Sequence, residues 1–124
     1  MKVQMIWYPK CSTCQKAKKW LEERNVSVQL RDIKEENPTP EELREWRERS
    51  GLPLKRFFNT SGLLYKERKL KERLPSMEEE EQYLLLGSDG MLVKRPILVG
   101  DSFVLTGFRP LEWEETLKKA GEGE

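Results

Sequence analysis

The hydrophobic and polar positions in the first quarter of the chain change their period twice. Val3 to Trp7 is a short apolar run with β-branched and aromatic side chains, which predicts a buried strand. From Ser12 to Asn25, apolar side chains recur at helical spacing between lysines and glutamates, which predicts an amphipathic helix. Val26 to Ile33 alternates apolar and polar residues, as half-buried strands do. The pattern therefore predicts an opening β-α-β unit.

The middle of the chain, over about residues 38–88, is predicted to be mainly helical. Thr39 to Glu42 has the residues of a helix start, with threonine as the N-cap, proline at the first helical position and glutamate three residues after the cap. Gly51 is predicted to end this helix, because glycine is common just after the last helical residue. A loop from Pro53 to Gly62 follows.

A second helical stretch is predicted before the chain returns to strands. Leu63 to Leu74 is highly charged and has a helical pattern. Pro75 to Glu79 offers another capping box, for a helix that runs through Leu86. The acidic side chains from Glu78 to Glu81 complement the positive end of that helix's dipole.

The last third of the chain is predicted to hold short strands and a final helix. Met91 to Val93 and Ile97 to Val99 have the residue types of short strands. A tight turn joins the second of these to Phe103 to Leu105, which predicts a β-hairpin. Leu111 to Ala120 is predicted to be an amphipathic helix, and the tail at 121–124 is predicted to be frayed.

Composition restricts the chemistry more than it restricts the fold. The 124 residues include 23 Lys and Arg, 22 Asp and Glu, and no histidine, for a net charge of +1. This balance argues against a strongly basic nucleic-acid binder, and the missing histidine excludes Cys-His pairs, Ser-His pairs and histidine-ligated metals. No segment has the pattern of a membrane span or a signal peptide, so we expect a cytoplasmic protein with no direct nucleic-acid or membrane partner.

The two cysteines form a Cys-x-x-Cys motif between the first predicted strand and the first predicted helix. This position puts Cys11 at a helix N-terminus, where unpaired N–H groups favour a thiolate, with Lys10 adding positive charge. Cys14 lies one helical turn further on, near enough to close a disulfide. Three interpretations remain open: a redox pair, half of a zinc site shared by two chains, or two inert buried cysteines. The sequence favours the redox pair, with no bound metal.

A second candidate feature is Arg95-Pro96, just before the predicted hairpin. The residue before a proline is restricted to extended geometry. One interpretation is a cis peptide bond that brings the positive charge of Arg95 close to Cys11. The other is an ordinary turn proline beside a solvated arginine.

Three segments together resemble a known family. Tyr8 to Cys14, Lys94 to Ile97 and Gly107 to Pro110 occur in the order seen in the thioredoxin-fold arsenate reductases and their relatives, including the Spx-type redox regulators. The resemblance implies an α/β, thioredoxin-like fold of β-α-β and β-β-α parts with a helical insert at about 38–88. It implies a single domain over residues 1–120.

The resemblance also implies roles for individual residues. Cys11 is similar to the family nucleophile, and Cys14 stands at the position of the resolving cysteine of Spx-type members. Arg95 and Arg109 resemble the arginines that bind an oxyanion, which suits guanidinium chemistry. The remaining expected substrate-groove residues are Ser12, Thr13, Pro96 and Asn59. Asn59 falls near the position where the arsenate enzymes carry a further arginine. Arg56 is close to that position in the sequence and could take the place of this arginine.

Two functions follow from this resemblance. The first is an arsenate reductase-like thiol–disulfide oxidoreductase that acts on a small oxyanion or a disulfide. It would have no bound cofactor and would use glutathione with glutaredoxin, or thioredoxin, as external reductant. The second is a non-enzymatic, redox-sensing regulator that binds RNA polymerase. Gly51 falls where Spx-type regulators use a glycine for that contact, although a glycine that ends a helix needs no partner to explain it.

Overall fold

The computed structural model describes residues 2–122, and these form two compact units. The sheet unit comprises the chain up to Asp32 and from Arg95 onward, and the insert unit comprises Ile33–Lys94. The insert expected at about 38–88 lies inside the second unit. None of the helices formed by residues 2–122 combines the length and the apolar character that crossing a membrane requires.

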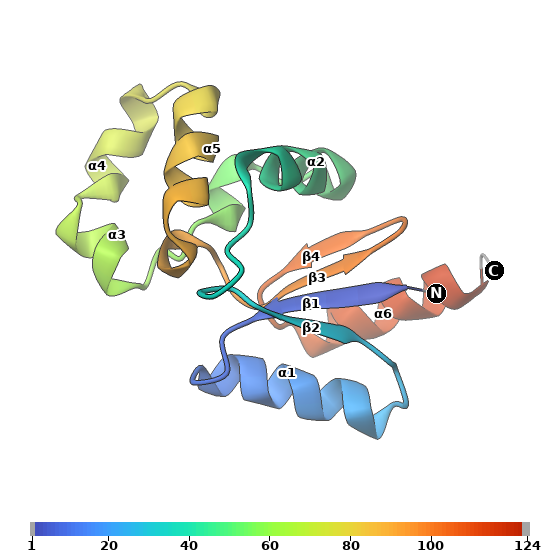
Figure 1. The fold of residues 1–124 in the computed structure, drawn as a ribbon. Helices are drawn as coiled ribbons and strands as arrows, with labels where there is room; N and C mark the ends of the chain where they lie inside the picture. Colours follow the sequence, from blue (N-terminus) through green and yellow to red (C-terminus); the bar gives the residue numbers. More distant parts are fainter. Residues whose placement is uncertain (1, 123–124) are drawn as a thin grey trace. The chain divides into compact units, whose positions relative to one another are not determined.

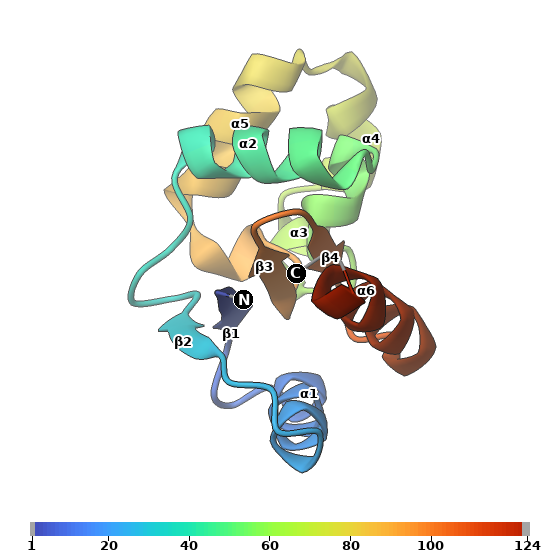
Figure 2. The same ribbon diagram turned by 90° about the vertical axis from the view of Figure 1, so that its right-hand side faces the viewer.

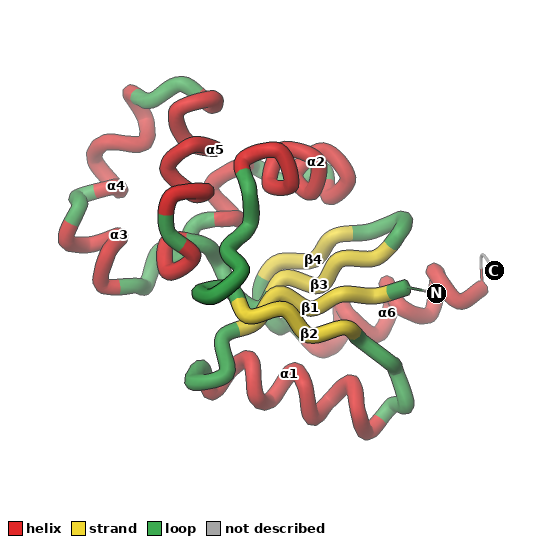
Figure 3. The backbone as a smooth tube through the Cα atoms, viewed as in Figure 1, coloured by secondary structure: helices red, strands yellow, loops and turns green. Residues whose placement is uncertain are grey.

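The sheet unit contains four strands in a mixed sheet. They are β1 (Val3–Trp7), β2 (Gln29–Asp32), β3 (Ile97–Gly100) and β4 (Val104–Thr106), in the spatial order β2-β1-β3-β4 (Figure 1). β1 pairs with β2 in parallel, and β1–β3 and β3–β4 are antiparallel. Figure 3 shows the sheet and its connecting loops as a tube. This arrangement confirms the α/β, thioredoxin-like fold class predicted from the sequence.

Two helices complete the sheet unit, α1 (Ser12–Glu23) and α6 (Pro110–Glu122). Their apolar sides share one core with one face of the sheet, because side chains alternate between the two faces along each strand. Met5, Leu98 and Trp113 are the fully buried centre of that core. Figure 2 shows α1 nearly along its axis and α6 obliquely, both beside the strands.

The insert unit is helical. Its elements are α2 (Pro40–Ser50), α3 (Leu63–Glu67), α4 (Leu70–Arg73) and α5 (Glu79–Ser88), with short 3-10 turns at Leu54–Phe57, Leu74–Ser76 and Gly90–Leu92. The predicted start of α2 is confirmed, because Thr39 Oγ1 accepts from the Glu42 amide at 3.1 Å and the Glu42 carboxylate accepts from the Thr39 amide at 3.0 Å. Its predicted end is confirmed as well, since Gly51 takes the left-handed conformation with φ 71°.

Two predictions in the insert were wrong in detail. The helix expected over Leu63 to Leu74 is broken after Glu67, because Lys69 adopts a left-handed conformation with φ 53°. The capping box before α5 is formed by Glu78 and Glu81, not within Pro75 to Glu79. Ser76 instead ends the 3-10 turn Leu74–Ser76, where its hydroxyl donates to the Arg73 carbonyl at 2.9 Å.

Several strand and helix boundaries also differ from the prediction. Met91 to Val93 is not a strand, because the Asp89 carboxylate accepts from the Met91 amide at 2.9 Å and caps a 3-10 turn. The strand predicted over Val26 to Ile33 is shorter in the structure. Only the four residues of β2 pair with β1. The final helix extends through 122, and residues 123–124 of the predicted frayed tail lie outside the described residues.

Candidate functional site

The strand register brings three segments of the sheet unit to one end of the sheet. Ile6 pairs with Ile97, and Ile97 pairs with Thr106. β1 and β4 leave the sheet just beyond this row, while β3 enters it there, because β3 is antiparallel to both neighbours. The loop that carries Cys11, the Arg95-Pro96 pair and the loop from Gly107 to Pro110 therefore lie at the same end. The helices α1 and α6 both begin at this end.

Cys11 occupies the N-cap position of α1. Its backbone is extended, with φ −88° and ψ 123°, its amide donates to the Tyr8 carbonyl at 2.9 Å, and its carbonyl accepts from the Gln15 amide at 3.0 Å. Gln15 Nε2 also donates to the Pro9 carbonyl at 2.7 Å, so the loop is tied to the first turn of the helix. The Cys11 side chain is half-buried and reachable from solvent.

Cys14 is fully buried in the first turn of α1. Its Sγ accepts the Tyr8 amide at 3.4 Å. Both cysteines are free thiols in this structure. The CxxC spacing therefore leaves one sulfur accessible and one shielded behind it.

The electrostatic setting of Cys11 lowers the pKa of its thiol. Burial of the sulfur opposes ionisation, but it is outweighed by the amide and side chain of Cys14, the guanidinium of Arg95 and the amide of Thr13. Amides at a helix N-terminus point toward an N-cap atom, and a guanidinium keeps its charge at all physiological pH values. Cys11 is thus disposed to be a thiolate without a titrating base.

The setting of Cys14 has the opposite effect. Burial raises the pKa of its thiol to about 12, and the negative charge of Cys11 adds to the increase, while the Tyr8 amide and the charge of Arg95 act against it. The first proton lost from the pair is therefore that of Cys11. A pair separated in this way has one nucleophile and one reserve thiol.

Arg95 precedes a cis peptide bond to Pro96, so the cis alternative is the one observed. The guanidinium lies 5.1 Å from the centroid of the Tyr8 ring, a cation–π contact that holds it at this end of the sheet. Within residues 2–122, the buried Nη1 of Arg95 has no hydrogen-bond partner. A buried guanidinium nitrogen of this kind is suited to an anionic ligand.

The structure places the other expected site residues in different surroundings. Lys10, Ser12 and Thr13 are exposed around Cys11, and Pro96 is buried. Arg109 is 60% exposed at the start of α6, where Nη1 lies 3.8 Å from the Glu112 carboxylate. Asn59 belongs to the insert unit, where its amide donates to the Leu92 carbonyl at 2.8 Å and Nδ2 lies 3.4 Å from the Met91 carbonyl.

The sequence interpretation missed two residues that act on the cysteines. Tyr8 supplies the amide that reaches Cys14 and the ring beneath Arg95, and Gln15 holds the Cys11 loop in place. Only the position of Gln15, four residues after Cys11, could have indicated its role. In the part of the chain that the structure describes, no three His, Cys, Asp or Glu side chains are placed to hold a metal ion.

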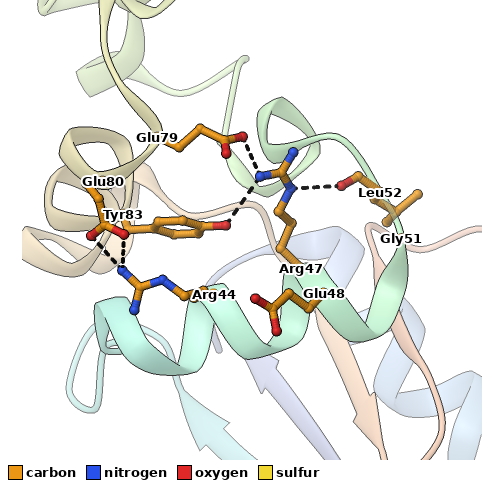
Figure 4. A pocket seen from close by; sticks show the side chains of 8 residues that line it. All are labelled: Arg44, Arg47, Glu48, Gly51, Leu52, Glu79, Glu80 and Tyr83. Carbon is orange, nitrogen blue, oxygen red and sulfur yellow. Dashed lines mark hydrogen bonds and ion pairs between the residues drawn. The ribbon is translucent and has the colours of Figure 1, made fainter.

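A pocket of about 390 Å³ opens beside Gly51 in the insert unit (Figure 4). Arg44 binds both carboxylate oxygens of Glu80 at 2.6 Å, and its guanidinium lies 5.0 Å from the centroid of the Tyr83 ring. Arg47 contacts Glu79, the Tyr83 hydroxyl at 3.4 Å and the Leu52 carbonyl at 3.3 Å. These contacts join α2 to α5 and give the pocket charges of both signs. A Cβ at Gly51 would meet no atom within 4 Å, so the rim of the pocket is open at this position.

Comparison with known proteins gives consistent matches over most of the chain. The uncharacterized protein YusI of Bacillus subtilis is 51% identical over 93% of this chain and 98% of its own length. The regulatory protein MgsR of the same organism is 30% identical over 90% of this chain and 87% of its own. The crystal structure of an ArsC family-related protein from Bacteroides fragilis superimposes with a TM-score of 0.90 at 58% identity, covering 93% of this chain and 97% of the other. Residues 6–116 match the ArsC family itself, and the chain therefore belongs to that family.

Proposed function

We propose that the protein is an arsenate reductase-like thiol–disulfide oxidoreductase in which Cys11 is the nucleophile and Cys14 the resolving cysteine. The observation that carries the proposal is the placement of the two free thiols, with the half-buried Cys11 at the N-cap of α1 and the fully buried Cys14 in its first turn. In keeping with this placement, the pKa is lowered at Cys11 and raised to about 12 at Cys14. A thiolate is the reactive form of cysteine, whereas a neutral thiol is not. Cys11 is therefore the first of the two sulfurs to ionise, while Cys14 stays a neutral thiol.

In the first step, the Cys11 thiolate attacks one sulfur of a disulfide substrate. The Cys11–substrate bond forms as the substrate's own S–S bond breaks, and the electron pair leaves on the second substrate sulfur as a thiolate. Before the attack, Arg95 stabilises the negative charge on the Cys11 sulfur. During the attack this negative charge moves to the departing substrate sulfur.

In the second step, Cys14 attacks Cys11 Sγ and releases the remaining substrate thiolate. Once Cys11 is bonded, its negative charge no longer raises the pKa of Cys14, while the positive charge of Arg95 still lowers it. The Cys14 proton passes to a departing thiolate or to solvent. The substrate disulfide is thus reduced to two thiols, and the protein is oxidised to the Cys11–Cys14 disulfide.

An oxyanion such as arsenate is the other proposed substrate. The Cys11 thiolate attacks arsenic and forms an S–As(V) bond as one As–OH bond breaks, and the departing hydroxyl takes a proton from solvent and leaves as water. Attack of Cys14 on Cys11 Sγ leaves the S–As electron pair on arsenic, which departs as arsenite. The unpartnered Nη1 of Arg95 supports the proposal, and Arg109 is placed at the same end of the sheet. In either cycle, glutathione with glutaredoxin, or thioredoxin, reduces the protein disulfide.

A turnover assay tests this proposal directly. Arsenate or a model disulfide is supplied with glutathione, glutaredoxin, glutathione reductase and NADPH, or with thioredoxin, its reductase and NADPH, and the NADPH consumption above that of the same mixture without the protein is followed. We expect turnover by the wild type and none by Cys11→Ser. A rate in Cys11→Ser equal to that of the wild type would contradict the role of Cys11.

A second candidate function is a redox-sensing regulator that binds RNA polymerase. It is favoured by the similarity to MgsR and by the open pocket beside Gly51. Its test is capture of RNA polymerase by the reduced and by the oxidised protein, with Gly51→Asn as the variant, because asparagine tolerates the left-handed turn. If the oxidised wild type captures RNA polymerase, the reduced wild type does not, and neither form turns over any substrate, the regulator proposal would replace the enzyme proposal.

A further inference from the structure

Another pocket, of about 270 Å³, opens within the insert unit. All of its lining residues belong to Ile33–Lys94, so this one unit forms the whole pocket. Leu54, Tyr65 and Leu74 give it an apolar lining, and each of these side chains is at most 8% exposed. Pockets for drug-sized molecules usually measure about 300–1,000 Å³, so this one suits a smaller ligand.

The hydroxyl of Tyr65 lacks a partner in this lining. Tyr65 is only 6% exposed, and its ring packs edge-on against Phe58, with 6.3 Å between the ring centroids. None of residues 2–122 forms a hydrogen bond with the Tyr65 hydroxyl. A buried tyrosine hydroxyl usually has such a partner, and Tyr65 lines the pocket, so its hydroxyl is available to a bound molecule.

The charged side chains of the lining leave a positive charge without a counter-ion. Lys55 and Lys71 are exposed and line the pocket, and no carboxylate in the described part of the chain forms an ion pair with either. The Glu79 carboxylate also lines the pocket, but it is paired with Arg47. An anion in the pocket therefore meets two cations that are free to bind it.

The same imbalance extends over the segment that supplies most of the lining. Residues 54–75 contain seven Lys and Arg and only two Glu, although the whole chain has a net charge of +1. Within the range 2–122, no carboxylate forms an ion pair with any of these seven cations. The two acidic side chains, Glu67 and Glu72, do not line the pocket. A group of uncompensated cations raises the local concentration of anions.

We propose that this pocket binds a small organic anion with an apolar body, such as an aromatic carboxylic acid. The apolar body lies against Leu54 and Leu74. The carboxylate faces Lys55, Lys71 and the Tyr65 hydroxyl. The proposal is independent of the thiol–disulfide function, because it uses neither cysteine.

Both parts of such a ligand are needed to match the lining. An inorganic anion leaves the apolar side chains uncovered, and covering apolar surface is favourable in proportion to the area removed from water. A neutral aromatic molecule leaves the two lysines without a counter-ion. An acidic peptide carries its carboxylates and its apolar side chain on different residues, whereas a small acid joins them within about ten atoms, which suits a pocket of this size.

The test is an NMR titration of the full chain labelled with ¹⁵N. The first three probes are 3-phenylpropanoate, which has both parts, 3-phenylpropanamide, which lacks the charge, and acetate, which lacks the apolar body. A Glu-Phe-Glu peptide with blocked ends is the fourth probe and stands for a polypeptide partner. The variants are Tyr65→Phe and Lys71→Gln. Lys66→Gln is the matched control, because Lys66 is an exposed cation of α3 that does not line the pocket.

We expect 3-phenylpropanoate to shift the amide signals of the lining residues and to bind about tenfold more tightly than its amide or acetate, and no less tightly than the peptide. Lys71→Gln should weaken its binding about threefold, as for a partly solvated charge pair. Tyr65→Phe should weaken it about fivefold through the loss of one hydrogen bond. Lys66→Gln should leave the affinity unchanged, and added salt should weaken the acid but not the amide.

Each contrary outcome removes a stated part of the proposal. Equal affinities for 3-phenylpropanoate and its amide overturn the anion site. Equal weakening by Lys66→Gln and Lys71→Gln shows attraction to the cationic segment as a whole and overturns the pocket as the site. Tighter binding of the peptide assigns the pocket to a polypeptide and overturns the small ligand. The absence of any shift at millimolar concentrations of all four probes overturns the proposal and leaves the thiol–disulfide function untouched.

Discussion

Replacing Arg95 by methionine isolates the contribution of a permanent positive charge to Cys11 reactivity. Methionine has a long, unbranched side chain and no charge, and the arginine site is half-buried. The guanidinium lowers the pKa of Cys11, so its removal moves that pKa back up. A neighbouring opposite charge shifts a pKa by roughly 1–3 units, and we expect about one unit here because both groups are partly solvated. This shift corresponds to about 1.4 kcal/mol.

The assay is the rate of Cys11 alkylation by iodoacetamide as a function of pH. Cys14 does not interfere below about pH 10, because its pKa is about 12. The rate of Arg95→Met should rise at a pH about one unit higher than that of the wild type, and its plateau should be similar. Lys19→Met, which removes an exposed charge on α1, is the matched control and should leave the profile unchanged.

The shape of the wild-type profile is equally informative. The chain has no histidine, and the groups that lower the pKa of Cys11 are amides, a thiol and a guanidinium. A single ionisation is therefore expected, without a second step near pH 6 to 7, where histidine titrates. Superimposable profiles for Arg95→Met and the wild type, or a two-step wild-type profile, would refute this reasoning.

Three further predictions concern Cys14 and the insert. Cys14→Ser should trap a mixed disulfide between Cys11 and the substrate, visible by mass spectrometry, and a wild type that accumulates the same adduct would contradict resolution by Cys14. The pKa of Cys14 is about 12 in the folded protein and about 8.5 in the unfolded chain. Between these two pH values the unfolded chain loses the Cys14 proton and the folded protein keeps it, so the stability present below pH 8.5 is lost as the pH rises toward 12. The unfolding free energy of reduced wild type should accordingly fall more steeply between pH 9 and 12 than that of Cys14→Ala; parallel curves in denaturant titrations would contradict this. Gly90→Ala should destabilise the protein by about 3 kcal/mol or more, because its Cβ would lie 1.9 Å from the Ile33 carbonyl oxygen, and an unchanged denaturation midpoint would show that the backbone relaxes there freely.

The fold was predictable where local pattern and tertiary structure agree. The Val3 to Trp7 strand, the capping box at Thr39 and the glycine stop at Gly51 are set by residues within a few positions of one another. The prediction failed where a local competitor acted. Asp89 caps a 3-10 turn in place of a strand at Met91, and Lys69 breaks a helix whose charged pattern runs on without interruption.

The candidate site was predictable in its sulfur chemistry and incomplete in its surroundings. The CxxC motif between a strand and a helix was enough to place Cys11 at a helix N-terminus. The difference in burial between the two sulfurs depends on how α1 packs against the sheet, which the motif does not encode. The contribution of Tyr8 was missed for a similar reason, since it acts through a backbone amide and a ring face, not through a group that marks a motif.

The central claim is that Cys11 reacts first and Cys14 resolves the adduct. Its most direct test is intact-protein mass spectrometry of the reduced protein after reaction with a slight excess of a disulfide, followed by peptide mapping. The account predicts a wild type that has lost two hydrogen atoms and carries a Cys11–Cys14 bond, and a Cys14→Ser variant that carries one substrate thiol on Cys11. A stable adduct on wild-type Cys11, or modification of Cys14 in a Cys11→Ser variant at the wild-type rate, would contradict it.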